Sequence, residues 1–478
     1  MMLVRSYGLR AAVVVLIGFY GAFFALLATP AARIALVVPV AAVALLWWML
    51  AGTQRWVAVL LASATLLPPL PVPLGDSGPH AAMLVALAGV LIGVARMNEW
   101  RPMFDSVTTW LCCFFAVLAA SAGPAFILSG GEVAAPTLAR VALFGIGVYV
   151  FLYAAHGPGS SAMPLAGPVR WMFAMAVLAA VLACLDFYYQ FPAPAGFSPQ
   201  FVWLDTGIFR RAQGFYYDAS ALGNFCAFFL VLTAVGLMDH SAFRPLPRWV
   251  WLGGGSILAA ALVLSYSRAS LLNVVAAGVT LAVVKRVRVK RIATTLAAAA
   301  VVTFGVVWYA FPSFAESYWI RLSASLEYFW SSPEGVLSGR VASWQTLVDF
   351  LMTHPWFAIF GIGYKTLPYS TIASRAVIPD NMYLSLLVET GVLGVAALLL
   401  FSGAVIRLGY RAAHDASPET RFVGTWMVCF WVGQMVQMMS GDLLTYWRVL
   451  PVYLWVFGIV VRRMKGRPAD ADLVPRSV

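Results

Sequence analysis

Long apolar runs follow one another along this chain, and they limit what it can fold into. A helix needs about 20 apolar residues to cross the hydrocarbon core of a bilayer. Soluble domains carry about 25% charged residues, whereas here 10% of the 478 residues are charged and 62% are hydrophobic. The sequence therefore predicts an all-α, polytopic membrane helix bundle.

The runs number about fourteen, with twelve as the alternative, because 55–70 and 422–438 are short for a full span. The first run is interpreted as a retained helix and not as a signal peptide, since Ala28-Thr29-Pro30 is a poor cleavage context. The predicted spans are 11–28, 33–51, 55–70, 80–96, 107–129, 137–154, 168–189, 219–238, 248–265, 268–284, 292–311, 383–406, 422–438 and 443–461.

The net charge of +12 is concentrated in short loops, above all at 285–291 and 462–465. Basic loops of this kind mark the cytoplasmic side of a membrane protein and do not indicate nucleic-acid binding. We therefore expect a multi-pass membrane protein with both termini in the cytoplasm. All five cysteines lie in apolar runs, which argues against both a disulfide framework and a zinc site.

This orientation leaves two long segments on the outer side, Gln190–Asp218 and Pro312–Asp380. A loop as long as the second one is usually functional or disordered, and its aromatic content argues against disorder. We divide the chain into an N-terminal transmembrane bundle (1–311), a large periplasmic loop (312–380), and C-terminal spans with a cytoplasmic tail (381–478).

Within the large loop, apolar residues recur at helical spacing from Arg340 to Leu351. This spacing predicts an amphipathic helix that lies on the membrane surface and ends at His354-Pro355. Gly361-Ile362-Gly363-Tyr364 then predicts a flexible turn.

The tight turn at Leu264–Ser270 carries Arg268 on the side where topology does not favour positive charge. Its guanidinium could bind a phosphate with two parallel hydrogen bonds; the alternative is that it reaches lipid headgroups. Arg210 and Arg211 are adjacent on an extended segment, so we expect only one of them, Arg211, to face the phosphate site suggested for Arg268. Asp218 is expected to be the N-cap of the helix that follows.

Asp380-Asn381 opens the span near residue 383, and Glu389 lies two turns further in. Asp380 is either the N-cap of this helix or a general base, because a carboxylate beside arginines stays ionised and can accept a proton from a hydroxyl. Glu389 needs a partner in its apolar surroundings, and an arginine such as Arg268 is a candidate. A structural salt bridge is slightly favoured over a catalytic role for Glu389.

The sequence has no cluster of histidines, cysteines or carboxylates at metal-ligand spacing, so it predicts no metal site. We also expect no cofactor. His80 and His354, the histidines on the outer side, are far apart in sequence. A diphosphate bound at this membrane face would therefore be neutralised by arginines alone.

An ordered set of short motifs between Arg211 and Gly394 resembles the O-antigen ligase and Wzy polymerase superfamily. Each motif alone is weak, but the set in this order on this topology is specific. The motifs are Arg211-x-x-Gly214, Ser267-Arg268, Gly339-Arg340-x-x-x-Trp344, His354-Pro355, Gly361-x-Gly363-Tyr364, Asn381-x-Tyr383-Leu384 and Glu389-Thr390-Gly391-Val392-Leu393-Gly394.

The resemblance implies a metal-independent, inverting glycosyltransferase of the bacterial inner (cytoplasmic) membrane with a periplasmic site. Arginines hold the diphosphate of a lipid-linked glycan there. Ligases of this superfamily carry His-Asn where this chain has Asp380-Asn381. That departure favours a polymerase of O-antigen or exopolysaccharide repeat units. An O-antigen ligase that transfers the glycan to lipid A core is the alternative.

In this interpretation the arginines bind the diphosphate and Asp380 deprotonates the acceptor hydroxyl. The aromatic residues of the loop, Trp319, Tyr328, Phe329, Trp330, Trp344 and Tyr364, either cover the site and stack on sugars or seat the loop in the membrane interface. The catalytic candidates are Asp380, Arg268 and Arg211, and the substrate-binding candidates are Arg340, Arg210, Tyr364, Trp344, Asn381 and Glu389.

The expected partners are an undecaprenyl-diphosphate-linked oligosaccharide donor, a glycan or lipid-linked acceptor and membrane lipids, with a chain-length regulator as a further candidate. A flippase of lipid-linked sugars would suit the span count, but it would be expected to show inverted repeats and a charged central passage. A peptidoglycan-type polymerase is a third alternative, which the ordered motifs disfavour.

Overall fold

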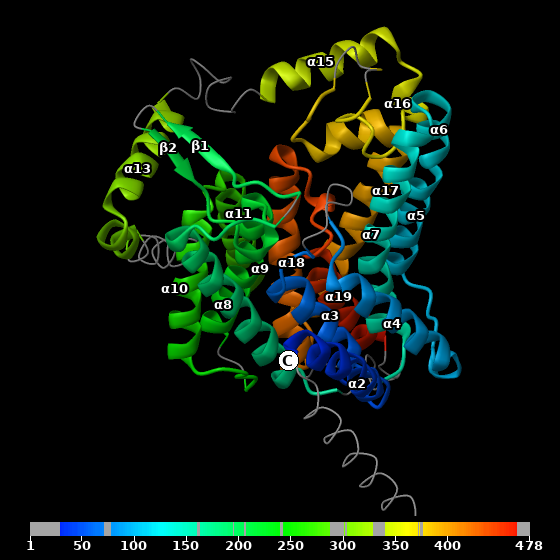
Figure 1. The fold of residues 1–478 in the computed structure, drawn as a ribbon, viewed down its shortest axis with the longest axis vertical. Coiled ribbons are helices and arrows are strands. Elements are labelled where there is room, and N and C mark those ends of the chain that lie inside the picture. The colour runs from blue at the N-terminus through cyan, green and yellow to red at the C-terminus, as the bar shows by residue number, and fades with distance from the viewer. Residues whose placement is uncertain are drawn as a thin grey trace, which may run out of the picture. The chain divides into compact units, whose positions relative to one another are not determined.

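The structure is a computed structural model in which the chain forms helices and one short hairpin within the described residues (Figure 1). Two compact units are distinguished, Met1–Val59 and Leu60–Val478. The first contains α2 (Pro30–Leu50) and the start of α3 (Arg55–Leu66). The described residues are 29–70, 78–159, 163–194, 196–204, 207–239, 242–286, 301, 304–327, 340–370, 372 and 376–465.

The second unit contains the other helices and the hairpin. The α-helices are α4 (Ala81–Ala95), α5 (Ser106–Ala120), α6 (Ala122–Ser129), α7 (Gly131–His156), α8 (Ala166–Tyr189), α9 (Ala219–Met238), α10 (Arg248–Leu264), α11 (Arg268–Lys285), α13 (Pro312–Glu327), α15 (Arg340–Thr353), α16 (Phe357–Phe360), α17 (Met382–Ala413), α18 (Pro418–Gln437) and α19 (Leu450–Lys465). The 3₁₀ turns are η1 (Met97–Glu99), η2 (Gly214–Tyr216), η3 (Met438–Ser440) and η4 (Leu443–Thr445), and the strands are β1 (Phe201–Leu204) and β2 (Gly207–Arg210).

Several of the helices have the length and composition of membrane spans, so the chain is a multi-pass membrane protein. Among the described residues, seven are long and apolar enough: Ser106–Ser129, Gly131–His156, Ala166–Tyr189, Ala219–Met238, Arg268–Lys285, Met382–Ala413 and Pro418–Ser440. The predicted span 11–28 and most of 292–311 lie outside the described residues. The total of about fourteen spans stays a prediction.

Two elements differ from the sequence-based expectation. Residues 190–218, expected to be a loop, contain the antiparallel β1–β2 hairpin, in which Phe201 pairs with Arg210 and Leu204 with Gly207. The run predicted as a span at 443–461 begins with the 3₁₀ turn η4 and becomes α-helical only at Leu450. Pro451 explains the later start, because proline is accepted in the first turn of a helix but would break its interior.

Helix α17 is interrupted at Gly391, and a loop that docks there donates hydrogen bonds to the carbonyl groups before the interruption. Gly391 lies inside this helix with φ 69° and ψ −171°, values that interrupt the helical hydrogen bonds. The carbonyl oxygens of Val388 and Glu389 accept hydrogen bonds from the amides of Ile362 (3.0 Å) and Gly363 (2.8 Å). The Gly361–Tyr364 turn and the Glu389–Gly394 motif therefore form one structural unit, which we call the glycine joint.

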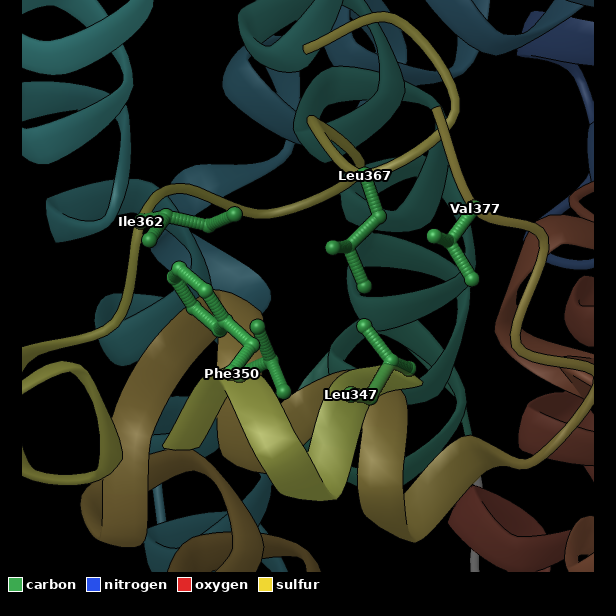
Figure 2. Close-up of a cluster of buried hydrophobic side chains, with 6 residues drawn as sticks. Leu347, Phe350, Ile362, Leu367 and Val377 are labelled. Atoms are coloured by element: carbon green, nitrogen blue, oxygen red, sulfur yellow. The ribbon is translucent and has the colours of Figure 1, made fainter. Parts of the chain in front are cut away.

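The loop that follows the glycine joint packs on α15. Leu347 and Phe350 point from α15 toward Ile362 of the glycine joint and toward Leu367 and Val377 of this loop (Figure 2). The helix predicted at 340–351 is confirmed as α15, and His354-Pro355 follows its last residue. After this small core the chain returns to the start of α15, where Asp380 contacts Arg340 and Pro379 contacts Trp344.

Candidate functional site

Arg211 and Arg268 are attached to one turn. Residues 265–267 join α10 to α11, and Arg268 is the first residue of α11. The Arg211 Nε donates a hydrogen bond to the carbonyl oxygen of Ser265 at 2.9 Å. The next amide, that of Ala212, donates to the carbonyl of Leu264 at 2.9 Å. Two arginines that are distant in sequence are therefore brought to the same turn.

Arg210 and Arg211 have different hydrogen-bond partners. The expectation that only Arg211 faces the site stays a prediction. The Arg210 guanidinium donates to Asp186 Oδ1 of α8 at 2.9 Å and to the carbonyl of Phe191 at 3.1 Å. Both side chains of the Arg210–Asp186 pair are buried. This pair holds the hairpin against α8, which explains why Arg210 is separated from its neighbour.

Asp380, Arg340 and Trp344 lie together where α15 meets α17. The Arg340 Nε is 3.1 Å from Asp380 Oδ2, and the two side chains are 27% and 43% exposed. The Trp344 indole donates to the carbonyl of Pro379 at 2.7 Å. Asn381, and not Asp380, caps α17, because its side-chain oxygen accepts from the amides of Tyr383 and Leu384. The capping role considered for Asp380 is therefore wrong.

A cavity of about 580 Å³ lies beside Asp380 and is within the size range of small-molecule sites. We call it the central cavity. Tyrosines line it: Tyr216, Tyr217, Tyr364, Tyr369 and Tyr446. Its charged lining residues are Arg140, Asp218, Lys365, Asp380, Asp442 and Arg448. Two of the candidates expected from sequence, Asp380 and Tyr364, are thus part of its wall.

Asp218 and Tyr446 connect the cavity wall electrostatically to the arginine turn. Asp218 is the N-cap of α9, as expected, and accepts from the amides of Ser220 and Ala221. Burial raises the pKa of Asp218; those two hydrogen bonds and then Arg211 lower it, and Asp380 raises it. Burial also raises the pKa of Tyr446, whose further influences include Asp218, Asp380 and Arg211. The catalytic candidates Arg211 and Asp380 therefore both influence the pKa values of Asp218 and Tyr446.

A buried charged cluster at the cavity was not expected from the sequence. The Lys365 ammonium donates a hydrogen bond to Asp442 Oδ2. Glu389 accepts from the Ser385 hydroxyl at 3.2 Å and from the amide of Leu367 at 3.3 Å. Lys365 supplies the nearby positive charge that we expected from an arginine. Burial lowers the pKa of Lys365 to about 8, and Glu389 opposes this shift.

Two more arginines at the cavity lie in runs that we interpreted as apolar spans. The Arg448 guanidinium donates to the carbonyls of Ala64 at 2.8 Å and Leu67 at 2.7 Å, and also to the carbonyl of Phe215. It thereby fastens α3 to the loop before α19. Arg140 of α7 donates to the carbonyl of Lys365 at 3.0 Å. An arginine within an apolar run is itself the sequence signal for such residues.

The remaining expected residues are placed as follows. Tyr364 is buried, and its carbonyl accepts from Thr137 of α7 at 2.8 Å. Trp319 on α13 is largely exposed, whereas residues 328–330, which include three of the loop aromatics, lie outside the described residues. In the part of the chain that the structure describes, no group of three or more His, Cys, Asp or Glu residues could hold a metal ion.

Comparison with known proteins supports the resemblance seen in the motifs. A family model described as O-antigen ligase matches residues 254–399. This segment runs from α10 into α17 and includes the turn with Arg268, the Arg340–Asp380 pair and the glycine joint. Arg211 and Asp442 lie outside it. No match to the chain was found among curated proteins.

Proposed function

We propose, from the membership of residues 254–399 in the O-antigen ligase and Wzy polymerase superfamily, that this membrane protein is an inverting, metal-independent glycosyltransferase. Its donor is a glycan linked to undecaprenyl diphosphate, and the reaction takes place at the periplasmic face. The product is a polymer of O-antigen or exopolysaccharide repeat units. Transfer of the glycan to lipid A core, which is a ligase reaction, is the second candidate.

The observation that carries this proposal is the attachment of Arg211 to the turn at which Arg268 begins α11. Guanidinium groups bind phosphate oxygens in bidentate fashion, and two of them on one turn offset the charge of a diphosphate. The same groups stabilise the charge that develops on the leaving diphosphate. The loss of one such preorganised contact typically raises a barrier by about 3–4 kcal/mol.

The acceptor occupies the central cavity, with Asp380 between acceptor and donor. The acceptor oxygen attacks the anomeric carbon, its proton passes to the Asp380 carboxylate, and the bond from that carbon to the diphosphate oxygen breaks. A single displacement inverts the anomeric centre. Asp380 is suited to this role because it lines the cavity and its carboxylate is partly exposed beside Arg340.

Two observations bear on polymerase against ligase. The matching family model is described as O-antigen ligase, which favours the ligase reaction. The aspartate at position 380, where the resembling ligases have histidine, favours the polymerase, since an ionised aspartate can act only as a base or a hydrogen-bond acceptor. We give greater weight to the difference at position 380, because it lies at the proposed reacting centre.

Purified protein incubated with lipid-linked repeat units tests the proposal. A ladder of product lengths indicates a polymerase, transfer to lipid A core indicates a ligase, and the absence of any glycosyl product leaves transport. Arg268→Ala should abolish transfer while the protein stays in the membrane. Arg407→Ala, which removes an exposed arginine of α17, is the matched control and should transfer normally. Full transfer by Arg268→Ala would contradict the proposal.

A further inference from the structure

Four amide side chains form a hydrogen-bonded cluster between α9, α11 and α18. Each is at most 1% exposed. The Asn224 Nδ2 donates to Gln434 Oε1 at 2.6 Å and to Gln437 Oε1 at 2.8 Å. The Asn273 Nδ2 donates to the same two oxygens at 3.2 and 2.9 Å. Asn224, Asn273, Gln434 and Gln437 are called the amide cluster below.

The amide cluster continues into the turn that carries Arg268. The Gln437 Nε2 donates to the Ser270 hydroxyl at 2.9 Å. The Ser270 and Ser267 hydroxyls are hydrogen-bonded at 2.7 Å, and the Ser267 amide donates to the Ser265 hydroxyl at 3.3 Å. The chain of hydrogen bonds thus ends at Ser265, whose carbonyl accepts from Arg211.

The same turn lies directly on the backbone of α9. A Cβ atom added at Gly223 would be 2.7 Å from Ser267 Cβ and 2.8 Å from the Ser270 hydroxyl oxygen. Only glycine allows this approach without a shift of the turn. The position of the turn is therefore fixed independently by a close contact with α9 and by hydrogen bonds from α18.

Helix association alone does not explain the cluster. Asn273 Oδ1 is buried and has no hydrogen-bond partner in the part of the chain that the structure describes. A polar atom left in this state costs free energy, and a partly satisfied polar network is less stabilising than apolar packing. Polar residues buried between membrane helices are accordingly functional candidates.

We propose that the amide cluster and Ser270 are positioning residues for Arg268. They hold the α10–α11 turn so that the guanidinium is in place before the donor diphosphate arrives, which avoids an ordering cost on binding. The inference rests on the proposed function, because it assumes that Arg268 binds the diphosphate.

Undecaprenyl diphosphate alone, titrated into the purified full-length protein in nanodiscs, is the probe. Ser270→Ala removes the link between Gln437 and the turn and should weaken binding by about 3- to 10-fold, the effect of one lost hydrogen bond. Ser402→Ala is the matched control, because this buried serine of α17 makes no hydrogen bond within the described residues. It should bind as the wild type does. Ser267→Ala is a second variant if Ser270→Ala does not fold.

A double-mutant cycle with Arg268→Lys separates positioning from general stability, since lysine keeps the charge and leaves weak binding measurable. If Ser270 acts through Arg268, Ser270→Ala should have little further effect in the Arg268→Lys background. An equal loss in both backgrounds, or no loss in either, would overturn the inference while the proposed function stands. Unchanged binding by Arg268→Lys and Arg268→Ala would instead refute the diphosphate site itself.

Discussion

At the residue scale, Asp380 and its neighbour Asn381 have different roles: Asn381 caps a helix, and Asp380 lies at the cavity. Asn381 uses its side-chain oxygen to cap α17, so that oxygen is committed to the fold. Asp380 has a left-handed backbone with φ 43°, and its carboxylate lies beside Arg340 at the edge of the central cavity. One carboxylate oxygen, Oδ2, contacts Arg340, and the other remains available to accept a hydrogen bond from a substrate hydroxyl.

Asp380→Asn should lower kcat of glycan transfer by about 100- to 10,000-fold, the usual contribution of general base catalysis. Asparagine adopts the left-handed conformation more readily than most residues, so the backbone should be preserved. Binding of undecaprenyl diphosphate should stay at the wild-type level, and titration in nanodiscs checks this. A variant that loses donor binding together with kcat would show that Asp380 has a structural role.

Lys365 should give the reaction an alkaline limit. Its pKa is lowered to about 8 by burial, so the ammonium that pairs with Asp442 loses its charge as the pH rises through that value. Transfer should therefore decrease from about pH 7 to about pH 9. Lys365→Arg keeps the charge and should shift the decrease to higher pH. The pH profile of kcat/KM measures both, and identical alkaline limits in the two proteins would contradict this assignment.

The folding stability should show the opposite pH dependence. The pKa of Lys365 is lower in the folded protein than the ordinary value of 10.5. Between these two values the unfolded chain binds more protons, so the contribution of this residue to stability increases with pH. Thermal unfolding of the wild type and of Lys365→Arg, measured over the same pH range as the activity, would therefore show whether activity decreases while the fold stays intact.

The positions of some residues of the candidate site were predictable from the sequence because their signals are local. Arg268 is conspicuous in a short turn, and Asp218 stands where a helix needs a cap. Lys365 and Asp442 are 77 residues apart and meet only because the loop docks on the broken α17. The arginine partner predicted for Glu389 was wrong for the same reason. The tertiary fold places Lys365 near Glu389, and no local sequence pattern indicates this.

At the scale of elements, the glycine joint connects two motifs that look independent in the sequence. A Cβ atom at Gly391 would be 2.1 Å from the carbonyl oxygen of Ile359, and one at Gly361 would be 2.4 Å from that of Glu389. Each glycine thus allows the backbone of the other segment to approach. The joint sets the position of the loop that carries Lys365 and leads to Asp380.

Gly391→Ala should destabilise the protein by about 3 kcal/mol or more, because the strained backbone and the clash with Ile359 add together. Gly403→Ala lies on the same helix, where a Cβ atom meets nothing within 4 Å. It should leave the melting temperature unchanged or slightly higher. Thermal unfolding of both variants in detergent checks the comparison, and equal melting temperatures would show that the joint is not under this constraint.

Elements with one strong periodicity were predicted well, and elements decided by tertiary contacts were not. The helical spacing from Arg340 to Leu351 predicted α15, which in the structure continues to Thr353. The β1–β2 hairpin has only four residues in each strand, too few for a clear alternation of apolar and polar residues. Residues 443–449 were predicted as part of a span. In the structure Arg448 donates hydrogen bonds to three backbone carbonyls outside α19, and these contacts favour a non-helical segment before α19.

At the scale of the whole molecule, the exposed surface of the spans is apolar. Large side chains such as Phe126 and Ile127 on α6, Leu138 on α7 and Leu393 on α17 are more than half exposed. A water-soluble protein rarely leaves so much apolar surface uncovered, whereas lipid covers it without cost. The bundle is therefore suited to a bilayer, and the distribution of basic loops predicts which end faces which side.

The predicted orientation can be tested with single cysteines in a variant that lacks the five native ones. Asp349→Cys on α15 and His414→Cys after α17 replace exposed residues at ends that we assign to opposite sides. A membrane-impermeant maleimide should label Asp349→Cys in intact spheroplasts, but His414→Cys only after permeabilisation, because the basic loops predict that residue 414 is cytoplasmic. The reverse pattern would place the Arg340–Asp380 pair, the central cavity and the arginine turn on the side that lacks polyprenyl-linked periplasmic substrates. The proposed reaction would then be impossible, even though every hydrogen bond in the site remained as described.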